Sequence, residues 1–158
     1  MGEHEQLIRE VESLTAAYIG CIDQDDLENW PVFFTEDCLY RITSRENYTR
    51  GLPAGFFYCS GRGMLQDRIA SLRRANIYEP YYYRHLVSGT RLRSVEPTGW
   101  RFFTNFQVIR TMKSGDMTLF AVGFFDDLVV ESDGQLRFQE KTVVCDSSRI
   151  DTLLVIPL

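Results

Sequence analysis

His85 is the side chain in this sequence best suited to acid–base chemistry near neutral pH. Imidazole titrates in that range, so a histidine oriented by a nearby carboxylate or phenol can act as a general base. Tyr83, Asp67 and Glu79 are near enough in sequence to supply that orienting group. The alternative, which we favour, is that a single histidine opening a strand makes a structural hydrogen bond or a subunit contact.

Two histidines, His4 and His85, are the whole imidazole content of the chain. A Rieske cluster needs two cysteines and two histidines in paired short motifs, and a mononuclear iron site needs two histidines and a carboxylate. His4 belongs to a terminal stretch that we expect to fray. We therefore predict no metal site, no bound cofactor and no catalytic group in this chain.

The four cysteines are widely spaced, lie among hydrophobic residues and form no CxxC pair, so they are interpreted as buried thiols. The glycine-rich, nucleophile-elbow and zinc-protease signatures are absent. Two acid–base pairs close in sequence, Asp67 with Arg68 and Glu79 with Arg84, are predicted to be ion pairs or interface contacts rather than catalytic pairs.

The segment from Met64 to Gly89 positions most of these residues and is predicted to be helix, turn and strand. Leu65, Ile69 and Leu72 recur at helical spacing on one face. Pro80 cannot continue that helix, so the chain must leave it as an aromatic strand beginning with three tyrosines.

The remaining elements follow from spacing and turn residues. An amphipathic helix is expected over Glu5–Gln24, and a short second helix, capped by Asp25 or Asp26 and closed by residues 35–37, should bury Trp30 with its apolar neighbours. A polar loop is expected at Ser44–Gly55. Strands are expected at Cys38–Thr43, Phe56–Cys59, Leu86–Val95, Trp100–Met112, Thr118–Glu131 and Leu136–Cys145.

Helices first and hairpin-linked strands last indicate an α+β domain, with helices packed on one face of an antiparallel sheet. In Trp100–Met112 the alternation buries one face and leaves the other wetter. We expect that outer face to carry Phe103, Ile109, Phe125 and Val143 among polar residues and to serve as an interface. The nearly uncharged end of the chain, residues 153–158, is expected to be tucked against the fold or a neighbour.

Length and composition limit the classes of protein. The 158 residues suit one domain, residues 1–158, that is 44% hydrophobic and carries a net charge of −5. No basic cluster is present, so nucleic-acid binding is disfavoured. No apolar run of about 20 residues and no signal-peptide pattern occur, so we expect a soluble cytoplasmic protein without a membrane contact.

Several segments resemble the small (beta) subunit of aromatic-ring-hydroxylating dioxygenases, the Rieske non-haem iron oxygenases. The resemblance rests on DRIASL, NIYEP and YRHLVS in the central segment, together with AAYIGCIDQDDLENWPVFFTEDCLYRIT and DSSRIDTLLVIPL. The matching positions in the centre are Asp67, Arg68, Leu72, Tyr78, Glu79, Pro80, Arg84 and His85. The run Tyr81–Tyr83 departs from that pattern, since many members carry Ser and Arg there.

The resemblance implies a cone-shaped fold of the nuclear transport factor 2-like, ketosteroid-isomerase-like type. It also implies a non-catalytic subunit in an assembly of three large and three small chains, with the small chains forming a trimer. The Rieske [2Fe-2S] cluster and mononuclear Fe(II) would lie in the large subunit and receive electrons from NADH through a reductase. GMLQDRIASLR, NIYE and the ending DTLLVIPL resemble members that act on salicylate, terephthalate or benzoate, and this resemblance implies an aromatic carboxylic acid substrate.

Two other functions stay open at this stage. One is a self-sufficient cone-fold isomerase or dehydratase, for which Tyr18, Tyr40 and Tyr58 with Asp23 and Asp37 supply a comparable set of side chains. The other is a module that binds a small ligand.

Overall fold

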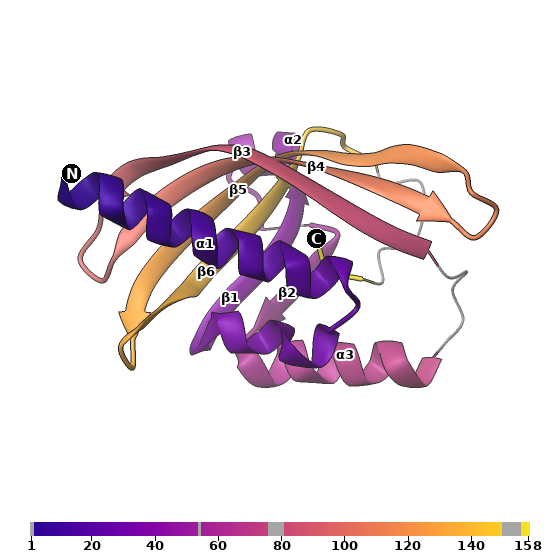
Figure 1. Ribbon diagram of the computed structural model, residues 1–158, viewed down its shortest axis with the longest axis horizontal. Helices are drawn as coiled ribbons and strands as arrows, with labels where there is room; N and C mark the ends of the chain where they lie inside the picture. Colours follow the sequence, from indigo (N-terminus) through magenta and orange to yellow (C-terminus); the bar gives the residue numbers. More distant parts are fainter. Residues whose placement is uncertain (1, 54, 76–80, 150–155) are drawn as a thin grey trace.

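The computed structural model describes residues 2–53, 55–75, 81–149 and 156–158. Six strands form one curved sheet, a long N-terminal helix lies across it, and another helix lies at the lower edge (Figure 1). Within the described ranges, no helix has the length and apolar character needed to cross a membrane. The elements in chain order are α1 (Glu3–Asp23), η1 (Leu27–Phe33), β1 (Phe34–Ser44), α2 (Arg45–Thr49), β2 (Phe57–Ser60), α3 (Arg62–Ala75), β3 (Tyr81–Val95), β4 (Trp100–Met112), β5 (Met117–Ser132) and β6 (Gln135–Cys145).

The two amphipathic helices form where the apolar spacing predicts them. The buried face of α1 carries Val11, Tyr18 and Cys21, and α1 packs across β3. Helix α3 buries Leu65, Ile69 and Leu72 on one side, as expected, and packs on η1, β1 and β2. Together these helices close the concave side of the sheet.

The strand order is β2-β1-β6-β5-β4-β3. Strands β3 to β6 form the predicted antiparallel meander. The sheet is nevertheless mixed, because β1 pairs with β6 in parallel, and the prediction of a purely antiparallel sheet was wrong at this pair. Parallel neighbours need a long crossover, here everything from α2 to β5, so no local turn marks the pairing in the sequence.

The region after α1 differs from the prediction in two ways. The short helix is a 3-10 helix that ends at Phe33, and Phe34 already belongs to β1, opposite Phe138 of β6. The expected closure of the helix at residues 35–37 was therefore wrong, because that stretch belongs to β1, between Phe34 and Leu39, which both pair with β6. The predicted loop from Ser44 contains one helical turn, α2, in which the Asn47 amide donates to the capping Ser44 hydroxyl.

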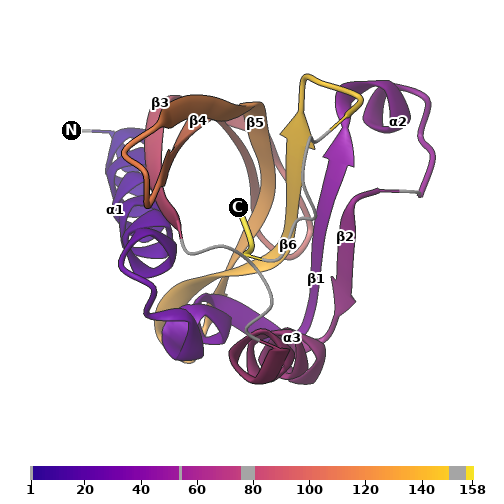
Figure 2. The same cartoon turned by 90° about the vertical axis from the view of Figure 1, so that its right-hand side faces the viewer.

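Irregular pairing bends the meander into a cone. In β3 the register shifts between Ser88 and Arg91, around Gly89, whose φ of +68° suits glycine. Between β4 and β5 it shifts after Val108, where Phe120 is the extra residue. Bulges of this kind bend and twist a strand. The sheet therefore curls around its interior, and Figure 2 shows the end of the chain inside the curl.

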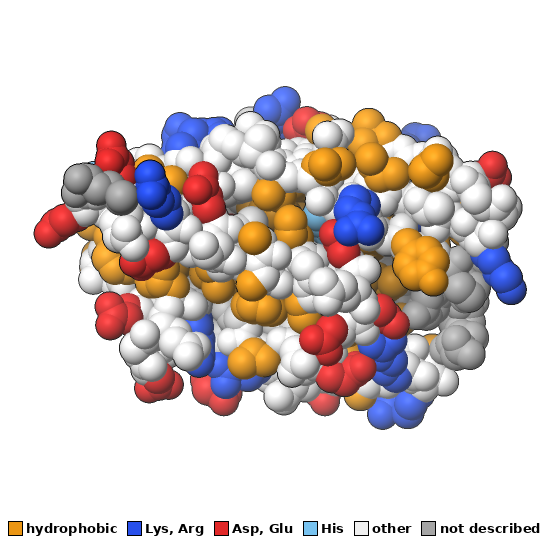
Figure 3. All heavy atoms as spheres, viewed as in Figure 1, with side chains coloured by type: hydrophobic (Ala, Val, Ile, Leu, Met, Phe, Trp, Pro, Cys, Tyr) orange, Lys and Arg blue, Asp and Glu red, His pale blue; other side chains and the backbone are white. Residues whose placement is uncertain are grey.

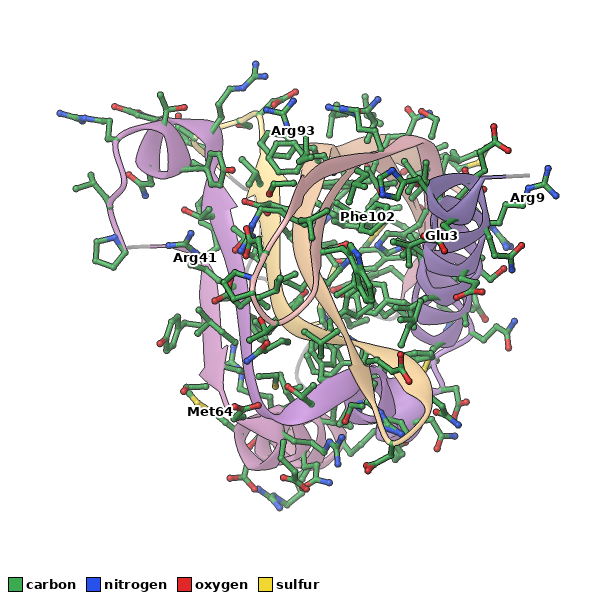
Figure 4. All side chains as sticks on the ribbon, turned by 90° about the vertical axis from the view of Figure 1, so that its left-hand side faces the viewer. Glu3, Arg9, Arg41, Met64, Arg93 and Phe102 are labelled. Carbon is green, nitrogen blue, oxygen red and sulfur yellow. The ribbon has the colours of Figure 1, made fainter. Side chains whose placement is uncertain are left out.

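The core lies on the concave side of the sheet. Phe102, Phe106 and Val108 of β4 are buried there as predicted, and Figure 4 shows Phe102 in the crowded space between the sheet and α1. Phe125 and Val143 are also fully buried in this core, so their expected place on the outer face was wrong. The register explains the error, because Phe125 pairs with the inward-facing Thr104 and not with Phe103.

Candidate functional site

Aromatic rings fill the interior of the cone. Tyr18 of α1 makes edge-on contacts with Phe34, Phe125 and Phe138, whose centroids lie 5.6–6.2 Å away. Trp30 of η1 is fully buried and lies edge-on to Tyr40 of β1 at 5.0 Å. Edge-to-face packing of this kind fixes ring orientation as well as burying apolar area. The two tyrosine hydroxyls are therefore held at defined positions inside the protein.

The last three residues of the chain reach these hydroxyls. Leu158 is fully buried, and its main-chain oxygen accepts hydrogen bonds from Tyr18 Oη at 2.5 Å and Tyr40 Oη at 2.8 Å. The Leu158 amide donates to Tyr40 Oη at 3.0 Å. The expectation that the chain end is tucked against the fold is thus confirmed for Ile156–Leu158, whereas residues 153–155 lie outside the described ranges.

A fully buried ion pair lies beside the tyrosines. Lys141 Nζ of β6 is 3.1 Å from both carboxylate oxygens of Asp127 on β5, and the ammonium lies 4.4 Å from the centroid of the Tyr18 ring. Burial raises the pKa of Asp127 to about 6, although Lys141 opposes that shift. Burial also lowers the pKa of Lys141, against the effect of Asp127. Neither residue was identified from the sequence, because a strand pattern does not show which charged residues face inward.

His85 on β3 is hydrogen-bonded to Asp23, at the last turn of α1. Its Nδ1 lies 2.6 Å from Asp23 Oδ1, and its backbone amide donates to Oδ2 at 2.8 Å. Neither Tyr83 nor Asp67, two of the suggested orienting groups, takes this place. Tyr83 lies edge-on to the imidazole at 6.1 Å, Asp67 is exposed on α3, and Glu79 is outside the described residues.

The buried His85 Nε2 has no hydrogen-bond partner among the described residues. Because a carboxylate can only accept, Nδ1 carries a proton, and Nε2 of the neutral ring is an acceptor. Such a pair has the arrangement of a general base, but it also ties the end of α1 to the middle of β3. The link between α1 and β3 follows directly from the two hydrogen bonds that His85 makes with Asp23.

The other candidate residues lie on the surface or in the core. The Arg68 guanidinium sits 4.0 Å from the centroid of the Phe57 ring, and in the described part of the chain it forms no ion pair with Asp67. Arg84 is exposed on β3, and the proposed pairing with Glu79 involves a residue outside the described ranges. Trp30 is a core residue, as its apolar setting predicted.

The outer face of β3–β5 carries a hydrophobic surface that we call the outer-sheet patch. Neighbouring positions across the three strands are Leu86, Gln107 and Val122, which line a hollow of about 510 Å³, and Ile109 and Leu119 form the next row. In Figure 3 hydrophobic side chains gather over this part of the sheet, at the upper right. The exposed apolar members are Tyr82 (75%), Met117 (71%), Leu119 (60%), Leu86 (45%) and Val122 (38%).

The residues present do not fit either iron group that the resemblance implies. A Rieske cluster or a facial triad requires two histidines, and His85 is engaged with Asp23 while His4 lies at the exposed start of α1. Within the described ranges no group of three or more His, Cys, Asp or Glu side chains could hold a metal ion. All four cysteines are free and buried, as predicted.

Comparison with known proteins shows the family to which the chain belongs. Residues 19–152 match the family model described as the ring hydroxylating beta subunit. The chain is 42% identical over 149 residues to the beta 1 subunit of the terminal oxygenase component of terephthalate 1,2-dioxygenase from a Comamonas species, covering 94% of this chain and 97% of the relative. It is 41% identical to the small subunit of anthranilate 1,2-dioxygenase from Burkholderia cepacia, with coverages of 94% and 92%.

A solved structure extends the match to three dimensions. It is the beta subunit of a proposed aromatic-ring-hydroxylating dioxygenase from Novosphingobium aromaticivorans, with a TM-score of 0.87, 34% identity and 96% coverage of each chain. The predicted α+β cone fold is therefore confirmed, although β1 and β6 pair in parallel. This chain belongs to the beta-subunit family of the aromatic-ring-hydroxylating dioxygenases.

Proposed function

We propose that this chain is the structural, non-catalytic small subunit of a terminal oxygenase that adds oxygen to the ring of an aromatic carboxylic acid. The observation that carries the proposal is the occupied interior of the cone. The Tyr18 and Tyr40 hydroxyls bind Leu158, and Lys141 binds Asp127, so these polar groups are satisfied by the chain itself. The aromatic carboxylic acid is supported by the terephthalate and anthranilate enzymes to which the two relatives belong.

In this proposal the iron chemistry belongs to a large subunit. That chain holds the Rieske [2Fe-2S] cluster and mononuclear Fe(II), and a reductase supplies electrons from NADH. The support from this chain is its ligand inventory, since two histidines, one of them paired with Asp23, cannot complete either site. The four free, buried thiols suit a reducing compartment, so we place the protein in the cytoplasm.

We further propose an assembly of three small and three large subunits, in which the small subunits contact one another through the outer-sheet patch. An apolar surface of this extent is uncommon on a monomer, and a head-to-tail contact can close into a ring. The patch also has the composition of an interface core, since Leu119 and Met117 are flanked by Tyr82. Asp67, Arg68 and Arg84 are exposed outside the core and are left for contacts with the large subunit.

Light scattering coupled to size exclusion, with and without a co-expressed large subunit, tests the assembly. The wild-type chain is expected to be trimeric alone and to join an assembly of six chains with the large subunit. Leu119→Glu places a charge in the outer-sheet patch and should give monomers. Val32→Glu is the matched control, because Val32 is similarly exposed, at 53%, but lies on η1. A wild-type chain that stays monomeric even with the large subunit present would refute the proposal.

A further inference from the structure

The interior around Leu158 is built like a binding site. One acceptor oxygen of Leu158 receives two phenolic hydroxyls that come from different elements, Tyr18 of α1 and Tyr40 of β1. These tyrosines lie 140 and 118 residues from Leu158 in the sequence, so the fold alone brings the three groups together. In Figure 2 the end of the chain lies within the curve of the sheet. The contact is therefore a tertiary one between a fixed site and a short segment.

The rings that hold the two tyrosines come from outside the segment. Tyr18 is held by the rings of Phe125 and Phe138, and Tyr40 is held by Trp30 at 5.0 Å and Phe57 at 5.6 Å. All of these rings belong to α1, η1 or the sheet. Aromatic walls with a few converging polar groups are the usual composition of a small-molecule pocket.

The polar groups of the site are chiefly donors. Burial raises the pKa of both tyrosine hydroxyls well above the ordinary value, so each keeps its proton. The fully buried Trp30 indole N–H adds a third donor. It has no hydrogen-bond partner among the described residues, and it lies close enough to Tyr18 to lower the pKa of that hydroxyl, against the larger effect of burial. The Lys141 ammonium lies over the same Tyr18 ring. That ammonium is paired with Asp127, so the hydroxyl and indole donors are what favour a ligand that presents an acceptor oxygen.

We propose that the cone interior is a binding site for a small apolar carboxylate or carbonyl compound, and that Ile156–Leu158 occupies this site as an intramolecular ligand. Leu158 supplies both features that such a ligand needs, an acceptor oxygen between Tyr18 and Tyr40 and a fully buried apolar side chain. A tethered ligand acts at an effective concentration of about millimolar or more, so a free compound of similar affinity does not displace it. The intact chain is therefore closed to ligands.

The test compares the intact chain with a chain that lacks residues 156–158. Two probes are titrated by calorimetry: N-acetyl-Ile-Pro-Leu, which reproduces the removed residues, and benzoate, which presents a carboxylate on an aromatic ring. The truncated chain should bind both probes, and the intact chain should bind neither. Tyr40→Phe in the truncated chain removes the group that both donates to and accepts from Leu158, so it should weaken tripeptide binding at least about 10-fold. Tyr58→Phe, on the exposed side of β2, is the matched control and should change nothing.

Each contrary result overturns a stated part of the inference. Equal binding by the intact and truncated chains would show that residues 156–158 do not occupy the site. Binding of the tripeptide without benzoate would refute the small-molecule assignment. If the truncated chain does not fold alone, the tripeptide at millimolar concentration should restore its far-UV circular dichroism, and failure to do so would refute the site. These readouts use the chain alone, whereas assembly with a large subunit is measured separately by light scattering, so failure of the interior site and failure of the assembly are distinguishable.

Discussion

Replacing Lys141 by methionine tests how the cone interior tolerates charge. The Lys141 and Asp127 side chains are 0% and 1% exposed, and the ammonium contacts both carboxylate oxygens at 3.1 Å. Methionine keeps an unbranched apolar side chain of similar length in place of the lysine stem. The variant therefore leaves Asp127 in the same buried position without its cation. Removing one partner of a buried ion pair costs about 3–5 kcal/mol of stability.

The loss should depend on pH in a defined direction. The folded-state pKa of Asp127 is already raised from 3.8 to about 6, and Lys141 is the main group that lowers it, so the variant raises this pKa further. Because the pKa of Asp127 is raised in the folded state, the contribution of this carboxyl group to the free energy of unfolding is fully present below about pH 4. That contribution is lost as the pH rises through the folded-state pKa. In the wild type this loss of stability is complete near pH 6. In the variant the free energy of unfolding continues to fall, by about 1.4 kcal/mol per pH unit, until the pH passes the higher pKa of Asp127. The difference between them should widen from pH 6 to pH 8.

Urea unfolding followed by tryptophan fluorescence at pH 5, 6, 7 and 8 measures this difference. Lys113→Met is the matched control, since Lys113 is the other lysine of the chain and is exposed in the β4–β5 hairpin; it should stay within about 0.5 kcal/mol of wild type. The double variant Asp127→Leu/Lys141→Met should recover most of the stability, because no unpaired charge is buried. A loss below about 1 kcal/mol, or one that is constant from pH 6 to pH 8, would refute the reasoning.

Three further predictions use other parts of the fold. Gly123→Ala places a Cβ 1.7 Å from the Val144 carbonyl oxygen and should lower stability by about 3 kcal/mol. Gly20→Ala, in open space on α1, should raise stability by about 0.5–1 kcal/mol. Thermal unfolding compares the two variants, and similar effects would contradict the packing argument. His85→Ala should cost about 1–3 kcal/mol, because it leaves Asp23 without the imidazole, and should weaken assembly; a wild-type chain that isomerises or dehydrates a ring ketone when the variant does not would show the structural assignment to be wrong. The chain purified alone should contain far less than one equivalent of iron by metal analysis; about one equivalent that survives chelator treatment would contradict this.

Strand and helix positions could be predicted wherever the local pattern is complete. Trp100–Met112 alternates strictly and is bounded by turn residues, and its ends agree with those of β4. The ends of β1 could not be predicted, because Phe34 is extended only through pairing with Phe138, more than 100 residues later. The inward position of Phe125 depends on the β4–β5 register, which bulges shift by one residue. A one-residue shift reverses every side chain, and no local pattern reports it.

The interior contacts depend even more on tertiary structure. Asp23 was among the carboxylates considered from the sequence, but nothing there connects it with His85, 62 residues away. Lys141 lies in a strand of ordinary polarity, and its burial follows only from the pairing of β6 with β5. The hydrophobic end of the chain did carry a signal, since its burial was expected from its composition. Its specific partners, Tyr18 and Tyr40, could not be predicted, because they come from two separate elements.

A curled sheet of this kind encloses more polar surface than its helices alone can satisfy. Among the described residues, several buried polar groups are matched within the chain: Asp127 by Lys141 of the neighbouring strand, the two tyrosine hydroxyls by Leu158, and Asp23 by His85. Each match avoids leaving a buried polar group without a partner, which costs about 1–3 kcal/mol or more. The same matches remove the groups that a substrate would need. Internal satisfaction of these groups therefore stabilises the fold, whereas the apolar side chains of the outer-sheet patch remain exposed.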